Sequence, residues 1–319
     1  MKTSAYHQAA AAVLAGDVRA SARLMRLLDD RMPDAAEVLR LLYAHTGRAQ
    51  VIGITGNPGS GKSTLTSRLI GQWRRQGKKV GVLAVDPSSP FSGGAILGDR
   101  IRMMEHASDP GVFIRSLATR GALGGLSRST SDTVHVMDAM GCDVVLIETV
   151  GVGQDEIDIV RTAHTTVVVL VPGLGDDIQA IKAGILEIAD IFVVNKADLD
   201  GADRTVGDLR GLQMLLSEMP PWIPPIVRTV AARGEGVEEL VEQLGHHQQF
   251  LTTHDAAQER NLMRARFVVS NLVREGIGQR VDRWLGQTSD GQALVAAVAQ
   301  RQLDPYTAAD QAELRTAAA

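Results

Sequence analysis

The chain contains little cysteine and few aromatic residues. Cys142 is the single cysteine among 319 residues, which excludes an internal disulfide framework and a cysteine-rich metal site. Aromatic residues make up 3% of the sequence, and Trp73, Trp222 and Trp284 form no pattern of the kind that stacks nucleic-acid bases. The chemistry of the protein must therefore come from its polar, charged and glycine-rich segments.

Long apolar runs and blocks of one charge are also missing. The apolar runs have strand length, well short of the roughly 20 residues of a membrane-spanning helix, and residues 1–15 lack the charged-then-apolar order of a signal peptide. The formal net charge is −4, without a long basic block, which argues against a nucleic-acid or anionic-membrane partner. We therefore expect a cytoplasmic protein that binds neither nucleic acid nor membrane.

Histidine offers no metal site either, because no pair has convincing ligand spacing. His246, His247 and His254 are expected on a solvated helix end. Cys142, just before an apolar run, is expected to pack in the core.

Apolar runs of strand length alternate with helix-like segments through the middle of the chain. The expected strands are Val51–Thr55, Val80–Val85, Val112–Arg115, Val144–Ile147, Thr166–Val171, Ile191–Val194 and Ile226–Val230. Helix-like patterns between them include residues 63–76, 177–188 and 236–250. This alternation predicts an α/β fold with a mostly parallel central sheet flanked by helices, which binds ligands at the carboxyl ends of its strands.

Both ends of the chain have helical periodicity. Apolar residues recur at helical spacing over residues 5–43, where Asp17 and Pro33 are expected to mark breaks or helix starts. The pattern returns over residues 256–284 and 292–302, and the last residues are expected to fray. We therefore expect helical extensions before and after the sheet.

A glycine-rich segment follows the first expected strand and opens a helix. It reads GNPGSGKS over residues 56–63, which fits the phosphate-binding pattern G-x-x-x-x-G-K-[ST] in the context that this motif requires. Its glycines let the backbone approach phosphate closely, and the helix adds its positive end. The expected nucleotide contacts are Gly56, Asn57, Pro58, Gly59, Ser60, Gly61, Lys62, Ser63 and Thr64. Lys62 would neutralise the β- and γ-phosphates, and Ser63 would bind Mg²⁺.

A second loop indicates the base. Asn195-Lys196-Ala197-Asp198 follows an apolar strand. The Asp198 carboxylate can accept from both N1–H and the 2-amino group of guanine, whereas adenine would leave it unpaired. Asn195 would join this loop to the phosphate loop, and the Lys196 stem would cover the ring. We therefore expect GTP as substrate, GDP as product and Mg²⁺ as cofactor.

The segment Val230-Ala231-Ala232 ends the next strand and completes the expected nucleotide contacts. A backbone N–H from Ala231 can reach guanine O6 at this position.

Acidic residues follow two further strands. Glu148-Thr149-Val150-Gly151 stands where P-loop GTPases commonly carry D-x-x-G, whose acid holds Mg²⁺ through water and whose glycine N–H bonds the γ-phosphate. Asp86 ends the second strand and Asp99 lies in a glycine-rich loop; either can approach Mg²⁺ or simply cap a turn or helix. Gln154 is a candidate for orienting the attacking water, or else a polar turn residue. We count Lys62, Asp99, Glu148, Gly151 and Gln154 as catalytic candidates.

In this order, these motifs resemble the MeaB/MMAA GTPases, also called ArgK or LAO/AO transport ATPases. The resemblance covers nearly the whole chain and is carried by residues 53–64, 85–89, 93–99, 148–154, 172–173, 175–182, 195–198 and 304–306.

The resemblance implies a homodimeric G-protein chaperone of adenosylcobalamin-dependent acyl-CoA mutases, chiefly methylmalonyl-CoA mutase, that gates cofactor loading. It implies an N-terminal helical extension (1–47), a P-loop GTPase domain (48–252) and a C-terminal helical extension for dimerisation (253–319). Asp99 would belong to a first switch, residues 148–153 to a second, and residues 176–182 to a third that signals to the mutase.

Two positions depart from the family pattern. Val230 replaces the usual serine, which affects a minor base contact, and Asp177 stands where glutamate is common. Two other functions compete with the mutase chaperone. One is an ArgK-type kinase acting on a periplasmic amino-acid-binding protein, although the sequence contains no protein-kinase catalytic loop. The other is a nickel-delivery GTPase, which would need the clustered histidine or cysteine that this sequence lacks.

Overall fold

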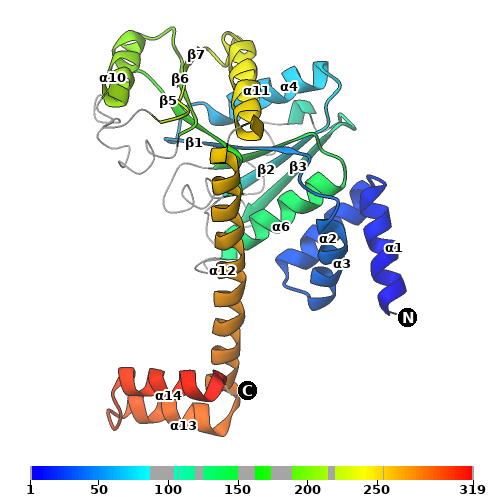
Figure 1. Cartoon of the computed structure of the whole chain (residues 1–319), viewed down its shortest axis with the longest axis vertical. Coiled ribbons are helices and arrows are strands. Elements are labelled where there is room, and N and C mark those ends of the chain that lie inside the picture. The colour runs from blue at the N-terminus through cyan, green and yellow to red at the C-terminus, as the bar shows by residue number, and fades with distance from the viewer. Residues whose placement is uncertain are drawn as a thin grey trace. The chain divides into compact units, whose positions relative to one another are not determined.

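The computed structural model describes residues 2–86, 104–106, 108–118, 125–149, 162–173, 189–214, 220–253 and 255–317. The chain divides into two compact units, Met1–Asn261 and Leu262–Ala319. The first unit contains the central sheet, and the second consists of helices (Figure 1). The helix expected at residues 177–188 lies outside the described residues.

The central sheet confirms the strands expected from the sequence. They are β1 (Gln50–Gly56), β2 (Val80–Asp86), β3 (Val112–Ala118), β4 (Val144–Thr149), β5 (Thr165–Leu170), β6 (Ile191–Asn195) and β7 (Ile226–Thr229). They lie in the order β3-β2-β4-β1-β5-β6-β7, and each pairing is parallel. β1 lies in the middle, where the strand order changes direction, which is where open α/β sheets bind their ligands.

Helices cover both faces of this sheet, because successive strand residues point to opposite faces and both sets are apolar. The covering helices are α4 (Lys62–Arg75), α6 (Gly125–Ala139), α10 (Ala202–Met214) and α11 (Val237–Thr253). Ile52 of β1 shares one core cluster with Leu65 of α4 and Leu240 of α11. Val51, its neighbour on the other face, shares a second cluster with Met137 of α6. The sheet is therefore anchored on both sides, and α4 and α11 lie on the same face.

The N-terminal residues form the expected helices, which are α1 (Lys2–Leu14), α2 (Val18–Asp29) and α3 (Pro33–Tyr43). Asp17 caps α2 by accepting from the N–H groups of Arg19 and Ala20 at 2.8 and 3.0 Å, as its short oxygen-bearing side chain favours. Leu24 of α2 and Val38 of α3 belong to the core cluster that contains the α6 face of the sheet. These helices are thus part of the first compact unit.

Asp138, near the end of α6, joins this helical layer to β1. Its carboxylate accepts from the N–H groups of Gly47, Arg48 and Ala49, the last at 3.1 Å. Asp138 is buried, so these donors compensate the loss of its hydration.

The expectation of solvated histidines was wrong for His247, which is fully buried in α11. Its Nδ1 lies 2.8 Å from the hydroxyl of Thr165, and its Nε2 lies 3.4 Å from the buried carboxylate of Asp190. His247 is one of the buried residues of α11, so this polar side chain needs partners in the core. Cys142 is buried as expected, and His254 lies outside the described residues.

The second unit contains the C-terminal part of α12 (Asp255–Gln287) together with α13 (Ser289–Ala299) and α14 (Pro305–Ala317). The final residues were expected to fray, but α14 is a helix. Asp304 Oδ1 accepts from the N–H groups of Tyr306 and Thr307, both at 3.0 Å, and Pro305 suits the first helical position. Asp304-Pro305 was therefore an overlooked helix start. No helix in the described parts of the chain has the length and apolarity to cross a membrane.

Candidate functional site: phosphate and base loops at the sheet edge

The phosphate loop lies between β1 and α4 as the sequence predicts. Gly56 and Gly61 have φ values of 140° and 90°, which side chains other than glycine rarely adopt. A Cβ on Gly61 would lie 2.4 Å from Asn195 Nδ2, and one on Gly56 would lie 2.1 Å from the Val169 carbonyl oxygen. Glycine is therefore required both for the turn and for the close approach of the neighbouring loop and strand.

Lys62 is buried in this loop. Its Nζ donates to the carbonyl oxygens of Gly56 at 2.6 Å and Asn57 at 3.0 Å. These bonds keep an ammonium group beside the start of α4, where N–H groups of the first turn have no intrahelical acceptor. The loop thus combines a cation with backbone donors, the groups that bind phosphate.

Two predicted metal-site residues meet beside the phosphate loop. Glu148 is the next-to-last residue of β4, which pairs with β1 so that Glu148 lies opposite Ile54. Its Oε1 accepts a short hydrogen bond from the Ser63 hydroxyl, and the glutamate is buried. A hydroxyl and a carboxylate are oxygen ligands of the type that Mg²⁺ prefers, so this pair fits the expected ion.

The other predicted metal and catalytic residues lie wholly or partly outside the described structure. Asp86 ends β2 at the same edge of the sheet, but its side chain lies outside the described structure, as do the residues Asp99, Gly151 and Gln154. Within the described residues, no group of three or more His, Cys, Asp or Glu side chains converges as metal ligands.

A cavity of about 260 Å³ lies next to the phosphate loop. Its lining contains Gly61, Thr64, Asn195, Lys196, Asp198, Leu199, Val230, Ala231, Ala232 and Arg233. The structure therefore brings the N-K-x-D loop and the segment after β7 together with the start of α4. The first two segments contain the expected base contacts, and the start of α4 belongs to the expected phosphate loop.

Asn195 joins these loops through its side-chain amide. Its Nδ2 donates to the carbonyl of Ser60 at 2.8 Å, and its Oδ1 accepts from the Thr229 hydroxyl at 3.0 Å and the Ala231 N–H at 3.1 Å. Lys196 has a φ of 54°, and its Nζ donates to the carbonyl of Gly59 at 2.9 Å. Both side chains thus bridge the base loop and the phosphate loop.

The segment after β7 differs from the sequence expectation in one respect. The Ala231 N–H, expected to meet guanine O6, is the donor to Asn195. The Val230 N–H donates to the carbonyl of Glu235 at 3.0 Å, and the Val230 side chain is buried. Among the N–H groups of this segment, that of Ala232 donates to no acceptor among the described residues.

Two arginines that the motifs do not contain contact residues of the candidate base site. Arg68 of α4 donates to the carbonyls of Ala231 and Ala232. Arg233 lies 3.3 Å from the Asp198 carboxylate and 2.7 Å from that of Glu235. The hydrogen bond to Glu235, followed by the charge of Glu235 and that of Asp198, raises the pKa of Arg233. The sequence gives no sign of the Arg68 contacts, because they depend on how α4 packs beside the segment after β7.

Known proteins are similar to this chain in sequence and in structure. A protein of Pyrococcus horikoshii named as a GTPase is 50% identical over 298 residues, which cover 92% of this chain and 93% of that protein. A Mus musculus protein, "Methylmalonic aciduria type A homolog, mitochondrial", is 37% identical over 231 residues, or 71% of this chain and 55% of that protein. A solved structure of an LAO/AO transport system kinase is 25% identical, covers 97% of both chains and has a TM-score of 0.69.

A family profile described as "Methylmalonyl Co-A mutase-associated GTPase MeaB" matches residues 21–284, which include the sheet and both loops of the site. The phosphate loop, the N-K-x-D loop and the parallel sheet are those of a P-loop enzyme that hydrolyses GTP. The chain belongs to the MeaB family of methylmalonyl-CoA mutase-associated GTPases.

Proposed function

We propose that this GTPase is a G-protein chaperone of an adenosylcobalamin-dependent acyl-CoA mutase of the methylmalonyl-CoA mutase type. It would gate the loading of cobalamin, and protect or reactivate the mutase. The observation that carries this proposal is the match of residues 21–284 to the mutase-associated family. A nucleotide site at the sheet edge suits the role, because a bound γ-phosphate can order loops that a partner then reads.

In the proposed reaction, water attacks the γ-phosphate of GTP and releases GDP and phosphate. Lys62 would leave the carbonyls of Gly56 and Asn57 and bond the β- and γ-phosphates, while N–H groups at the start of α4 hold phosphate oxygens. Little covalent chemistry is required of the protein, so catalysis consists mostly of positioning and charge neutralisation.

Ser63 and Glu148 would hold Mg²⁺, the serine directly and the glutamate through water. The ion would supply positive charge that offsets the charge developing on the phosphate oxygens. The contact of Ser63 with Glu148 supports this assignment, because both side chains already lie beside the phosphate loop. Asp86, Asp99, Gly151 and Gln154 keep their predicted roles as hypotheses, as does the third switch at residues 176–182.

The base would enter the cavity beside Asp198. The Asp198 carboxylate would accept from N1–H and the 2-amino group, and Lys196 would cover one face of the ring. Asn195 would not touch the base; it holds the surrounding loops together through Ser60 and Ala231.

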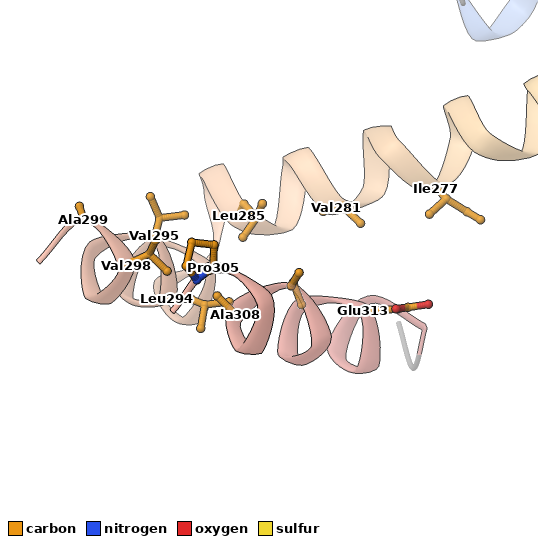
Figure 2. A pocket seen from close by; sticks show the side chains of 12 residues that line it. Ile277, Val281, Leu285, Leu294, Val295, Val298, Ala299, Pro305, Ala308 and Glu313 are labelled. Atoms are coloured by element: carbon orange, nitrogen blue, oxygen red, sulfur yellow. The ribbon is translucent and has the colours of Figure 1, made fainter. Parts of the chain in front are cut away.

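We also propose that the C-terminal helices form a homodimer. The second unit contains an apolar cavity of about 670 Å³, lined by residues of α12, α13 and α14 (Figure 2). The labelled side chains include Leu285 of α12, Val295 of α13 and Ala308 of α14. An open apolar cavity of this size favours a protein partner, and a second copy of the chain is the occupant that the family resemblance implies.

Light scattering with size-exclusion chromatography tests this dimer. Val295→Asp should convert the dimer to a monomer, since it puts a charge into the proposed interface. Val18→Asp on α2 is a matched control, because both valines are 51% exposed. A wild-type monomer would contradict the dimer, and a Val295→Asp variant that dimerises as well as Val18→Asp would contradict the proposed interface.

The function is tested by GTP hydrolysis, measured with the purified protein alone and with each candidate acyl-CoA mutase, and with ATP as a control. GTP-selective stimulation by one mutase is the expected result and would identify the partner. If no mutase changes hydrolysis while GTP still binds, the protein is a GTPase that serves another partner. Phosphate transferred to protein rather than released would favour the alternative, an ArgK-type kinase for a periplasmic amino-acid-binding protein.

A further inference from the structure

Arg68 connects the helix after the phosphate loop to the segment after β7. Its Nε donates to the carbonyl of Ala231 at 3.0 Å, and its Nη2 donates to the carbonyl of Ala232 at 2.7 Å. A guanidinium has a planar, rigid set of donors, so two bonds from it restrict the orientation of two consecutive peptide groups. These two residues also line the cavity proposed for the base.

The direction of one carbonyl determines the direction of one N–H. The Ala231 carbonyl and the Ala232 N–H belong to the same planar trans peptide, in which the C=O and N–H bonds point in opposite directions. Arg68 holds the oxygen of this peptide on the side of α4. The Ala232 N–H must therefore point in the opposite direction, away from Arg68.

The neighbouring donors are already used. The Ala231 N–H bonds Asn195 Oδ1 at 3.1 Å, and the Arg233 N–H bonds the carbonyl of Val230 at 2.9 Å. The Ala232 N–H faces no acceptor among the residues that the structure describes. A backbone donor at the lining of a binding cavity is a specificity element, because a ligand that satisfies it gains a hydrogen bond and one that opposes it does not.

We propose that Arg68 is a positioning residue of the base site, which holds the Ala231–Ala232 peptide so that the Ala232 N–H donates to the O6 carbonyl of guanine. Adenine carries an amino group at this position, so it would set a donor against a donor. Arg68 thus contributes to base selection without touching the nucleotide. The inference rests on the proposed guanine site and goes beyond it, since Asp198 reads the opposite side of the base edge, N1–H and the 2-amino group.

Calorimetric binding of three purine nucleotides, with ADP as a fourth for reference, separates the two parts of the base edge. GDP presents the full edge; 6-thio-GDP replaces O6 by sulfur, a weaker acceptor; IDP lacks the 2-amino group that Asp198 would read. The wild type should prefer GDP to 6-thio-GDP by about three- to tenfold, the value of one hydrogen bond. Arg68→Ala should bring this ratio close to one, while the GDP-to-IDP ratio stays within about twofold of the wild type.

Two further variants control the experiment. Arg75→Ala removes the same charge from an exposed position on the same helix and should leave both ratios unchanged. Arg68→Lys keeps the charge and one donor, so it should give an intermediate ratio and replaces Arg68→Ala if that variant does not fold.

If Arg68 has a merely structural role, Arg68→Ala will weaken the binding of GDP and of 6-thio-GDP by the same factor. The ratio of the two affinities would then stay as in the wild type, which would overturn the inference. A wild type that does not distinguish GDP from 6-thio-GDP would overturn it as well. If the wild type binds IDP and GDP with no preference over ADP, the guanine site itself is wrong. The failure of the site and the failure of the Arg68 role therefore give different results.

Discussion

The guanidinium of Arg233 lies 3.3 Å from the carboxylate of Asp198, so the residue expected to read guanine already has a cation beside it. Guanine and Arg233 would compete for the same oxygen atoms. Exposed ion pairs are weak, and the side chains of Asp198 and Arg233 are 37% and 54% exposed. Arg233→Ala should therefore tighten GDP binding by about two- to fivefold, measured by calorimetry at low ionic strength.

Arg228→Ala is the matched control for this prediction. Arg228 is another exposed arginine of the same region, paired with Asp203 at 2.6 Å, and its loss should leave GDP affinity unchanged. Weaker GDP binding by Arg233→Ala would mean that the guanidinium supports the base instead of competing with it.

Glu148 should govern the use of Mg²⁺ more than the binding of GDP. Glu148→Gln keeps the shape of the side chain but removes the charge that would hold the ion through water. The Mg²⁺ concentration for half-maximal hydrolysis should rise about tenfold, as for other outer-sphere ligands, while GDP affinity in EDTA stays within about twofold. An equal loss in both measurements would remove Glu148 from the metal site.

Asp190 should make the stability of the fold depend on pH. Burial favours the neutral acid, but the hydrogen bond from His247, together with the charges of His247 and Arg260, outweighs burial and lowers the pKa of Asp190. A lowered pKa means that the carboxylate stabilises the folded state fully above the usual value of about 3.9. That stabilisation is lost as the pH falls through the folded-state pKa.

Urea unfolding of Asp190→Asn tests this prediction. At pH 7 the variant should lose about 3 kcal/mol of unfolding free energy, because Arg260 loses its buried partner at 2.7 Å. The difference from the wild type should shrink as the pH falls below about 4. Asp203→Asn, at an exposed ion pair, should change stability little at any pH. A difference that is independent of pH would show that Asp190 acts through packing alone.

The sequence predicted the sheet well because its strands are nearly continuous apolar runs, as buried parallel strands must be. Val144–Ile147 and Ile191–Val194 were expected as strands, and both lie within fully buried strands. The motif loops were also predictable, because each needs particular residues next to a strand end. Gly61 and Asn195 are examples, since their close approach permits no side chain on the glycine.

The remaining contacts were not predictable, because they depend on packing between distant segments. His247 looked like a surface histidine, yet its position on α11 faces Thr165 and Asp190. Nothing near Arg68 in the sequence points to Ala231, which lies 163 positions away. The Ala231 N–H, which was expected to meet guanine O6, donates to Asn195 instead. The reason is the same, because the choice between adjacent N–H groups depends on the path of the segment after β7.

Asp198→Asn tests whether Asp198 selects guanine, on which the proposed nucleotide specificity depends. An asparagine can still accept from N1–H, but its amide opposes the 2-amino group of guanine and matches the 2-oxo group of xanthine. The affinity of the wild type and the variant for GTP and XTP should be measured side by side. We expect the variant to lose about 100-fold in GTP affinity and to gain preference for XTP. A variant that binds GTP as tightly as the wild type, with no gain for XTP, would contradict it.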